Sequence, residues 1–187
     1  MMDEARLIHR GRKPPKSYTT AMDEEQCAKM RIDMTPIGIV RSPFQERFAA
    51  PRQPSLGGQT AARILLRKDL NLHQALTDLD GFSHIWILYW MHLNQGWNPT
   101  VMPPRGPKIR RGVLATRAPH RPNSIGLSAV RLTKISGLTL HIEGCDMLDG
   151  TPVLDIKPYL PYADAIPDAD PGWTCILEEN ASGLTRP

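Results

Sequence analysis

The chain has 187 residues, of which 41% are hydrophobic and 22% charged, values that are ordinary for one globular domain with short extensions. No apolar run approaches the roughly 18 residues that cross a bilayer, and the N-terminal residues lack the apolar core of a secretory signal. We therefore expect a cytoplasmic protein with no membrane segment.

The cysteines and histidines give little support to a metal site. Three cysteines are widely spaced without a CxxC pair, and six histidines show no HxxxH or HxH spacing. The cysteines are therefore predicted to be reduced thiols, with Cys145 in the core, and no metal is expected.

The net charge of +4 is concentrated in one part of the chain. Between residues 105 and 121 there is no acidic residue and there are six basic ones: Arg105, Lys108, Arg110, Arg111, Arg117 and Arg121. Such a block indicates a footprint for phosphates. A solvated loop whose arginines serve solubility is the alternative.

Three regions follow one another along the chain. Residues 1–33 are polar and low in β-branched residues, which predicts a flexible extension before a folded domain of residues 34–165. Residues 166–187 form a C-terminal tail, predicted to be loosely attached after Pro171.

The folded domain is predicted to be mainly β. We expect strands at residues 37–40, 62–66, 83–92, 112–116, 125–135, 138–143 and 152–159. The strand at 83–92 is almost continuously apolar, which indicates burial on both faces. One helix is expected between a cap at Asn71 and a stop at Gly81. Short strands with Pro- and Gly-rich corners are typical of a β-barrel or a sandwich.

Four segments carry candidate binding residues. In the first, Pro51 and Pro54 stiffen a loop and pre-organise the polar side chains of Arg52 and Gln53. In the second, His92 and Asn94 stand at the end of the apolar strand. A stiffened structural loop and a hydrogen-bonded structural histidine remain the respective alternatives.

The third segment, residues 115–128, is the strongest, and the fourth is the strand after the Asp149–Gly150 turn. The third is a rigid polar loop between two strands, which is where binding residues concentrate. On the fourth, Asp155 and Lys157 project from one face of an otherwise apolar strand. This pair indicates a partly buried acid–base site, with a structural ion pair as the alternative.

Several of these blocks resemble one known family. They are Thr35–Phe44, Arg47–Phe48, Pro51–Pro54, Gly81–Trp86, Ala115–Arg117, Arg121–Ser128 and Asp149–Asp164, in that order. They look like the TsaA-like (TrmO, YaeB) family. That resemblance implies a compact β-barrel methyltransferase, active as a homodimer, which uses S-adenosylmethionine and no metal. Family members methylate N6 of threonylcarbamoyladenosine at position 37 of tRNA.

The resemblance also implies roles for individual residues. The matching positions for contact with the cofactor are Pro51, Arg52, Gln53, His92, Leu93, Arg117, Leu127, Leu148, Asp149, Gly150 and Thr151. Candidates to assist loss of the acceptor proton are Asp155, Lys157 and Tyr159. Candidates to hold the RNA are Arg105, Arg110, Arg111, Arg121 and Asn123.

The chain departs from the family in three respects. It has Val101-Met-Pro-Pro-Arg105 where the family often has one more arginine, and the loop after Arg105 is short. About twenty residues follow Asp164 where several members continue into a second module. An S-adenosylmethionine-binding protein with another methyl acceptor, or with a regulatory role, is therefore the second hypothesis. A non-catalytic nucleic-acid-binding barrel is the third, and few aromatic residues accompany the basic block to support it.

Overall fold

A computed structural model describes residues 23–46, 49–51, 53, 60–175 and 177. The chain divides into two compact units, Met1–Met34 and Thr35–Pro187. The first unit contains helix α1 (Glu24–Lys29), which begins with a capping box in which Asp23 and Gln26 bond each other's backbone amides. Among the described residues, no helix is long and apolar enough to cross a membrane.

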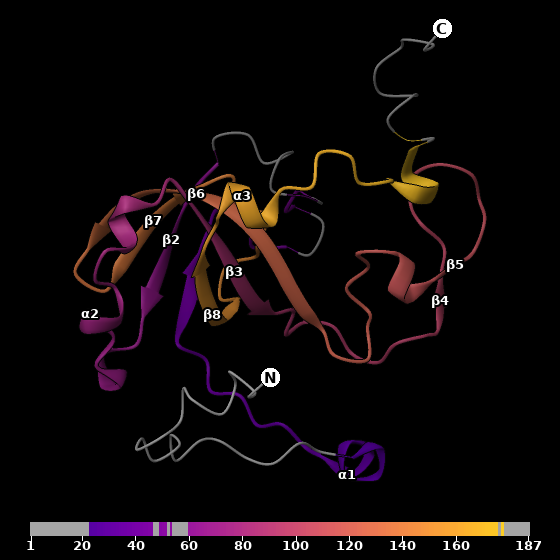
Figure 1. The fold of residues 1–187 in the computed structure, drawn as a ribbon, viewed down its shortest axis with the longest axis horizontal. Helices are drawn as coiled ribbons and strands as arrows, with labels where there is room; N and C mark the ends of the chain where they lie inside the picture. Colours follow the sequence, from indigo (N-terminus) through magenta and orange to yellow (C-terminus); the bar gives the residue numbers. More distant parts are fainter. Residues whose placement is uncertain (1–22, 47–48, 52, 54–59, 176, 178–187) are drawn as a thin grey trace, which may run out of the picture. The chain divides into compact units, whose positions relative to one another are not determined.

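The second unit is built on a closed antiparallel barrel, as the sequence predicts. Its strands are β1 (Gly38–Arg41), β2 (Ala61–Leu66), β3 (His84–Trp90), β6 (Ile125–Ser136), β7 (Thr139–Glu143) and β8 (Pro152–Pro158). They are ordered β1-β2-β7-β6-β3-β8, and β8 closes on β1 (Figure 1). A separate two-stranded sheet pairs β4 (Thr100–Val101) with β5 (Arg111–Gly112).

The interior of the barrel is filled by alternate side chains of the strands. Eight aliphatic ones are no more than 1% exposed: Val40, Ile64, Ile85, Ile87, Val130, Leu140, Ile142 and Val153. Branched aliphatic residues at every second position suit a closed sheet, since one face of each strand is dry and the other is accessible. Cys145 is also buried in this core, as predicted, and burial raises the pKa of its thiol to about 11.

The pairing around the barrel is uneven. Strand β6 is long enough to pair with β3 through its first half and with β7 through its second, with a register shift between Leu132 and Lys134. Strand β3 shifts register against β8 between Leu88 and Tyr89. The β1–β8 seam has only two register pairs, starting from Gly38. Irregularities of this kind bend strands and help a small sheet to close.

Three predictions of local structure were wrong in part. Helix α2 is a single turn (Leu72–Ala75), and Asn71 makes no side-chain cap bond because it adopts the left-handed region, at φ 47°. Residues 113–115 form the 3-10 helix η5 instead of continuing a strand. In β3 only Ile85 and Ile87 are fully buried, because the barrel covers one face of the strand and leaves the other accessible.

The two ends of the barrel differ in their connections. At one end lie the long segments 42–60 and 91–124 and the segment 144–151, and we name this end the loop end. At the other end lie η3 (Lys68–Leu70), α2, η4 (Leu79–Gly81) and the β6–β7 turn. Short helix α3 (Pro161–Asp164) follows β8 at this second end.

Candidate cofactor site at the loop end of the barrel

The residues predicted to bind the cofactor converge at the loop end. They come from three connections that are far apart in the sequence, namely residues 51–53, 92–117 and 148–151, and from the start of β6. The antiparallel order of the barrel brings these connections together, because β1, β3 and β7 end where β2, β6 and β8 begin. Arg52 lies outside the described residues.

A hydrogen bond joins two of the predicted residues directly. The Arg117 guanidinium donates through Nη1 to Oε1 of Gln53 at 2.7 Å, although the residues are 64 positions apart. Arg117 is exposed, and its guanidinium carries N–H donors besides the one that bonds Gln53. The pair therefore presents a cation that a ligand carboxylate or phosphate can reach.

The turn at Asp149 anchors the chain that leads toward Gln53. The Asp149 carboxylate accepts from the Ser42 amide at 3.0 Å and from Arg41 Nη1 at 3.1 Å. The Asp149 amide donates to Phe44 and the Gly150 amide donates to Val40. These donors are thus used within the fold, and the turn fixes where the segment after β1 emerges.

A polar cluster that the sequence analysis did not single out lies at the same end. Ser128 donates to Oδ1 of Asp146 at 2.7 Å, and its hydroxyl also lies 3.4 Å from that of Tyr89. Tyr89 stands opposite Gly126 across the β3–β6 ladder, where a Cβ on Gly126 would lie 2.2 Å from the tyrosine ring. The absent side chain of Gly126 therefore makes the space for Tyr89.

Burial controls the ionisation of this cluster. Desolvation raises the pKa of Asp146 above its ordinary value, against the hydrogen bond from Ser128 and the charge of Arg117. Desolvation, reinforced by the negative charge of Asp146, raises the pKa of Tyr89 to about 12. A carboxylate with a perturbed pKa is a recognised mark of a functional site. Here the pKa of Asp146 is also affected by the charge of Arg117, one member of the Gln53–Arg117 pair.

A second set of candidates lies on the outer face of the barrel. Leu127, on β6, is 54% exposed and stands opposite Leu88 on β3, which in turn stands opposite Asp155 on β8. With strands about 4.8 Å apart, Asp155 is therefore roughly 10 Å from Leu127. Lys157 forms a 2.6 Å ion pair with Asp155, but Lys157 itself is exposed. The sequence predicts a partly buried pair, and only Asp155 is partly buried, whereas Lys157 is exposed.

Tyr159 is not brought to the loop end. It packs on Trp86 with ring centroids 5.4 Å apart, and its amide donates to His84, at the start of β3. Eight residues of extended chain, roughly 26 Å, separate it from Thr151. Within one copy of the chain, Tyr159 and the Gln53–Arg117 pair are at opposite ends of the barrel.

The segment after β3 places His92 and Leu93 in a turn. The His92 amide donates to the Trp90 carbonyl at 2.9 Å, and Asn94 closes the turn through two bonds to Met91. His92 is half-buried, whereas Leu93 is 53% exposed. Asn94 therefore has a structural role, and Leu93 offers an apolar surface.

The predicted RNA-binding residues have different environments. Arg105 and Asn123 are exposed, and Arg110 is exposed but bonds Thr100 across the β4–β5 sheet. Arg121 is half-buried and donates to the carbonyls of residues 113, 116 and 118, the closest at 2.7 Å. Arg121 thus holds the loop that precedes Asn123 and β6.

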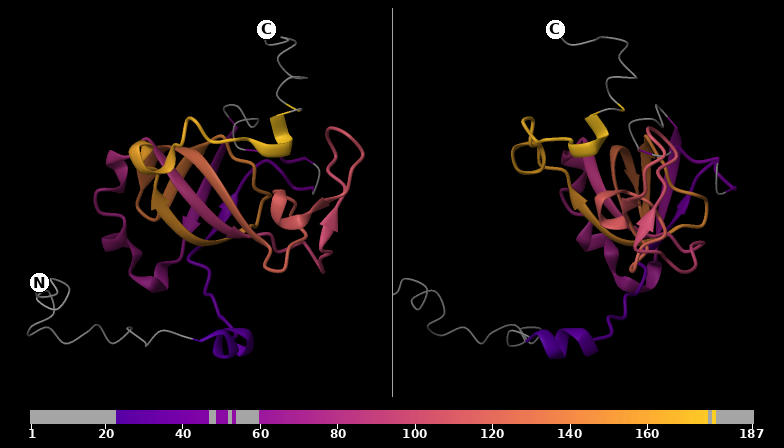
Figure 2. Two further views of the ribbon diagram at one scale, coloured as in Figure 1. Left: turned by 45° about the vertical axis from the view of Figure 1, so that its right-hand side comes forward. Right: turned by 90° about the vertical axis from the view of Figure 1, so that its right-hand side faces the viewer.

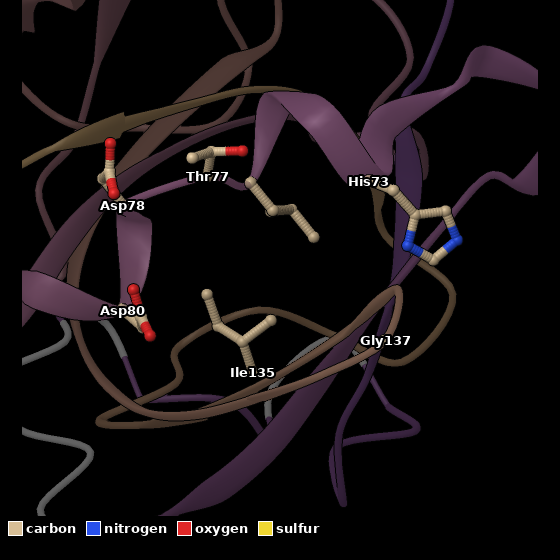
Figure 3. Close-up of a pocket in the computed structure, with 7 residues that line it drawn as sticks. His73, Thr77, Asp78, Asp80, Ile135 and Gly137 are labelled. Atoms are coloured by element: carbon tan, nitrogen blue, oxygen red, sulfur yellow. The ribbon is translucent and has the colours of Figure 1, made fainter.

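Open hollows lie at both ends of the part of the barrel unit that the structure describes. One, of about 440 Å³, lies between the segment with His73, Asp78 and Asp80 and the β6–β7 turn, at the end opposite the Gln53–Arg117 pair (Figure 3). The other, of about 570 Å³, lies over β1, β2 and β7 and includes Arg41 and Asp149. The first hollow contains none of the predicted cofactor residues, and the second contains Asp149 alone among them.

The groups at the loop end fit S-adenosylmethionine better than a metal ion. Among the described residues no group of three or more His, Cys, Asp or Glu side chains could hold a metal. A guanidinium for a carboxylate (Arg117), an amide for polar edges (Gln53) and an apolar side chain (Leu93) match the parts of a nucleoside with an amino-acid arm.

Comparison with known proteins identifies the family of the chain. Curated relatives include the "tRNA (adenine(37)-N6)-methyltransferase" of Escherichia coli (strain K12), 46% identical over 71% of this chain and 60% of that protein. The "Probable S-adenosyl-L-methionine-binding protein" of Methanothermobacter thermautotrophicus is 42% identical over 73% of this chain and 96% of that protein. A crystal structure of TrmO from Pseudomonas aeruginosa superposes with a TM-score of 0.66 at 45% identity, covering 76% of this chain and 62% of that one.

The chain thus spans about 60% of the length of the Escherichia coli relative. The family model described as "tRNA-methyltransferase O N-terminal domain" matches residues 39–165, which include all six barrel strands except the first residue of β1. The chain belongs to the tRNA-methyltransferase O N-terminal domain family.

Proposed function

We propose that this chain is an S-adenosylmethionine-dependent methyltransferase that acts on N6 of adenine 37 in tRNA, with threonylcarbamoyladenosine as the acceptor. The observation that carries the proposal is the Gln53–Arg117 hydrogen bond, which unites two family cofactor positions at the loop end. The name of the Escherichia coli relative supports the reaction and the base. A tRNA substrate also supports a cytoplasmic location.

The residues of the loop end account for binding and alignment. When bound, S-adenosylmethionine supplies an electrophilic methyl group on a sulfonium. Arg117, held by Gln53, is suited to the carboxylate of the amino-acid arm. Leu127 and Leu93 offer apolar walls. Methyl transfer is an in-line displacement, so a rigid site that aligns the acceptor nitrogen supplies much of the rate.

Loss of the acceptor proton needs a group near the transferred methyl. Of the three candidates, Asp155 is best placed, since it lies on the same outer face as Leu127. Lys157 holds the Asp155 carboxylate in one position through its 2.6 Å ion pair. Tyr159 is expected to contribute least, because it lies at the other end of β8.

The protein is further proposed to act as a homodimer. Ile125 and Leu127 leave 37% and 54% of their surface exposed on the outer face of β6, beside Leu88 and Asp155. A second copy on this face would cover apolar surface that the single chain leaves in water. Ile125→Asp is expected to shift sedimentation equilibrium toward the monomer, and a wild-type protein that is monomeric at all concentrations would refute the dimer.

The test of the reaction is transfer of a labelled methyl group from S-adenosylmethionine to tRNA. Two tRNA preparations are compared, one carrying the threonylcarbamoyl group and one lacking it. We expect label only in the first, and its absence there would refute the proposal. Arg117→Ala is expected to raise the Kd for S-adenosylmethionine by about tenfold or more, as loss of a charged hydrogen bond implies. Arg131→Ala, an exposed arginine on β6, is the matched control.

A second candidate is a protein that binds S-adenosylmethionine for another acceptor or for regulation. The Methanothermobacter relative favours it, because 96% of that protein is matched and its name specifies binding alone. This function predicts normal cofactor affinity, lost in Arg117→Ala, without transfer to either tRNA preparation.

A further inference from the structure

The β4–β5 hairpin carries the basic block away from the barrel. Strand β4 pairs with β5, and the connection between them, residues 102–110, contains Arg105 and Lys108 at exposed positions. Arg110 donates to the hydroxyl and the carbonyl of Thr100, which fixes its position at the base of the hairpin. None of the ion pairs formed by described residues involves the hairpin, so its positive charge is not neutralised within that part of the chain.

Described residues of the C-terminal segment contact this hairpin and the residues that follow it. Trp173, in 3-10 helix η6 (Gly172–Thr174), donates its indole N–H to the Ala115 carbonyl at 2.7 Å. The guanidinium carbon of Arg111 lies 5.2 Å from the centre of the Trp173 ring. Leu177 contacts the hairpin near Gly106. Figure 2 shows the segment with η6 beside the hairpin.

The geometry of this contact restricts Arg111 without neutralising it. A guanidinium on an indole is attracted to the ring face, and its N–H groups remain available at the edge for an anion. The indole N–H is itself satisfied by Ala115, which fixes the ring. Arg111 therefore loses little conformational freedom when it binds a phosphate.

The surroundings of the hairpin suit single-stranded RNA better than a small anion. Trp97, Met102 and Ile109 are 49%, 45% and 50% exposed in the hairpin and the segment leading to it. Together with Trp173 they place aromatic and apolar side chains near the basic block, within which the sequence has few aromatic residues. Cations beside such side chains are the usual components of a surface that binds unpaired nucleotides.

We propose that the β4–β5 hairpin and Trp173 form one binding surface for an unpaired stretch of RNA, in which Trp173 is the positioning residue that holds Arg111 against a phosphate. This rests on the proposed tRNA substrate and adds to it the surface that contacts the loop around the modified base. Trp173 lies outside the part of the chain that matches the family model, which ends at residue 165.

The experiment measures the Kd of threonylcarbamoylated tRNA at several salt concentrations for the wild type, Trp173→Ala, Trp173→Phe and Arg111→Ala. Trp173→Ala is expected to bind about five- to tenfold more weakly, and its slope of log Kd against log salt is expected to fall by about 0.7, the value for one phosphate of a single strand. Trp173→Phe keeps an aromatic face and should recover most of the slope. The double variant Trp173→Ala with Arg111→Ala should be no weaker than either single variant.

Controls separate this surface from folding and from the reaction. Tyr162→Ala removes an aromatic side chain that is 87% exposed elsewhere in the C-terminal region and should leave the Kd and the slope unchanged. All variants should bind S-adenosylmethionine as the wild type does. An unchanged slope in Trp173→Ala, or additive effects in the double variant, would overturn the inference even if the wild type methylates tRNA. A wild type that neither binds nor methylates tRNA would overturn the proposed function as well.

Discussion

The close fit between Gly126 and Tyr89 makes a quantitative test of the loop end possible. In Gly126→Ala the new methyl carbon would lie 2.2 Å from two ring carbons of Tyr89. Carbon atoms in contact are normally 3.5–4.0 Å apart, so the ring has to move by roughly 1.5 Å. Because the ring lies against Ser128 and the β6 strand, the displacement cannot be taken up by a flexible side-chain end.

The expected loss of stability follows from two contributions. Overpacking of this kind costs about 1–3 kcal/mol, and displacement of the Tyr89 hydroxyl weakens a long hydrogen bond to Ser128, at about 0.5 kcal/mol. We expect a decrease of about 3 kcal/mol in the free energy of unfolding. At about 2–4 °C per kcal/mol for a chain of this size, the Tm should fall by roughly 6–12 °C.

Urea denaturation measures this change, and isothermal titration with S-adenosylmethionine measures its effect on the site. Gly81→Ala is the matched control, because nothing lies within 4 Å of its Cβ position. The double variant Gly126→Ala with Tyr89→Leu should be more stable than additivity predicts, since the smaller side chain relieves the clash. A decrease of less than about 0.5 kcal/mol for Gly126→Ala would refute the packing argument.

Three further predictions concern single residues. Because burial raises the pKa of Asp146, the folded state binds its proton more tightly than the unfolded state, and stability should fall as pH rises from the ordinary aspartate pKa through the raised one. Asp146→Asn, which can still accept from Ser128, should remove this pH dependence, as urea titrations at about pH 4 and pH 7.5 would measure. At pH 7.5 the variant should be more stable than the wild type, and a less stable variant at that pH would contradict the argument. Arg121→Ala should lower the free energy of unfolding by about 1.5–3 kcal/mol, whereas Arg105→Ala should change it by less than about 0.5; equal effects in denaturation would show that Arg121 has no structural role. Tyr159→Phe should keep kcat within about twofold of the wild type in the methyl-transfer assay, and a tenfold loss would restore Tyr159 as a catalytic residue.

The barrel was predictable because its strands alternate cleanly. Thr139–Glu143 has buried residues at every second position, and the Gly137 turn before it has the positive φ that favours glycine. Local patterns failed where tertiary contacts decide the structure. The helix predicted between Asn71 and Gly81 ends at Ala75, and Asp78, inside that span, adopts a left-handed conformation that no periodicity reveals.

The loops that form the site were predictable from the sequence, but the contacts between their residues were not. Motif spacing gave Gln53 and Arg117 separately, while their contact depends on the strand order of the barrel. Asp146 has no distinctive sequence signal, because its importance comes from burial beside Ser128. Trp173 likewise gains its partners only when η6 meets the hairpin.

The short seam between β1 and β8 has a consequence for motion. With only two register pairs, it is the place where the closed sheet has least backbone pairing, and the Asp149 turn adds bonds from Ser42 and Arg41 at its loop end. Local opening should therefore begin here, and the amides of Val40 and Gly150 should exchange with solvent deuterium before those of β3 or β6. A ligand seated on the adjoining loops would slow that exchange, which would make the seam a reporter of occupancy.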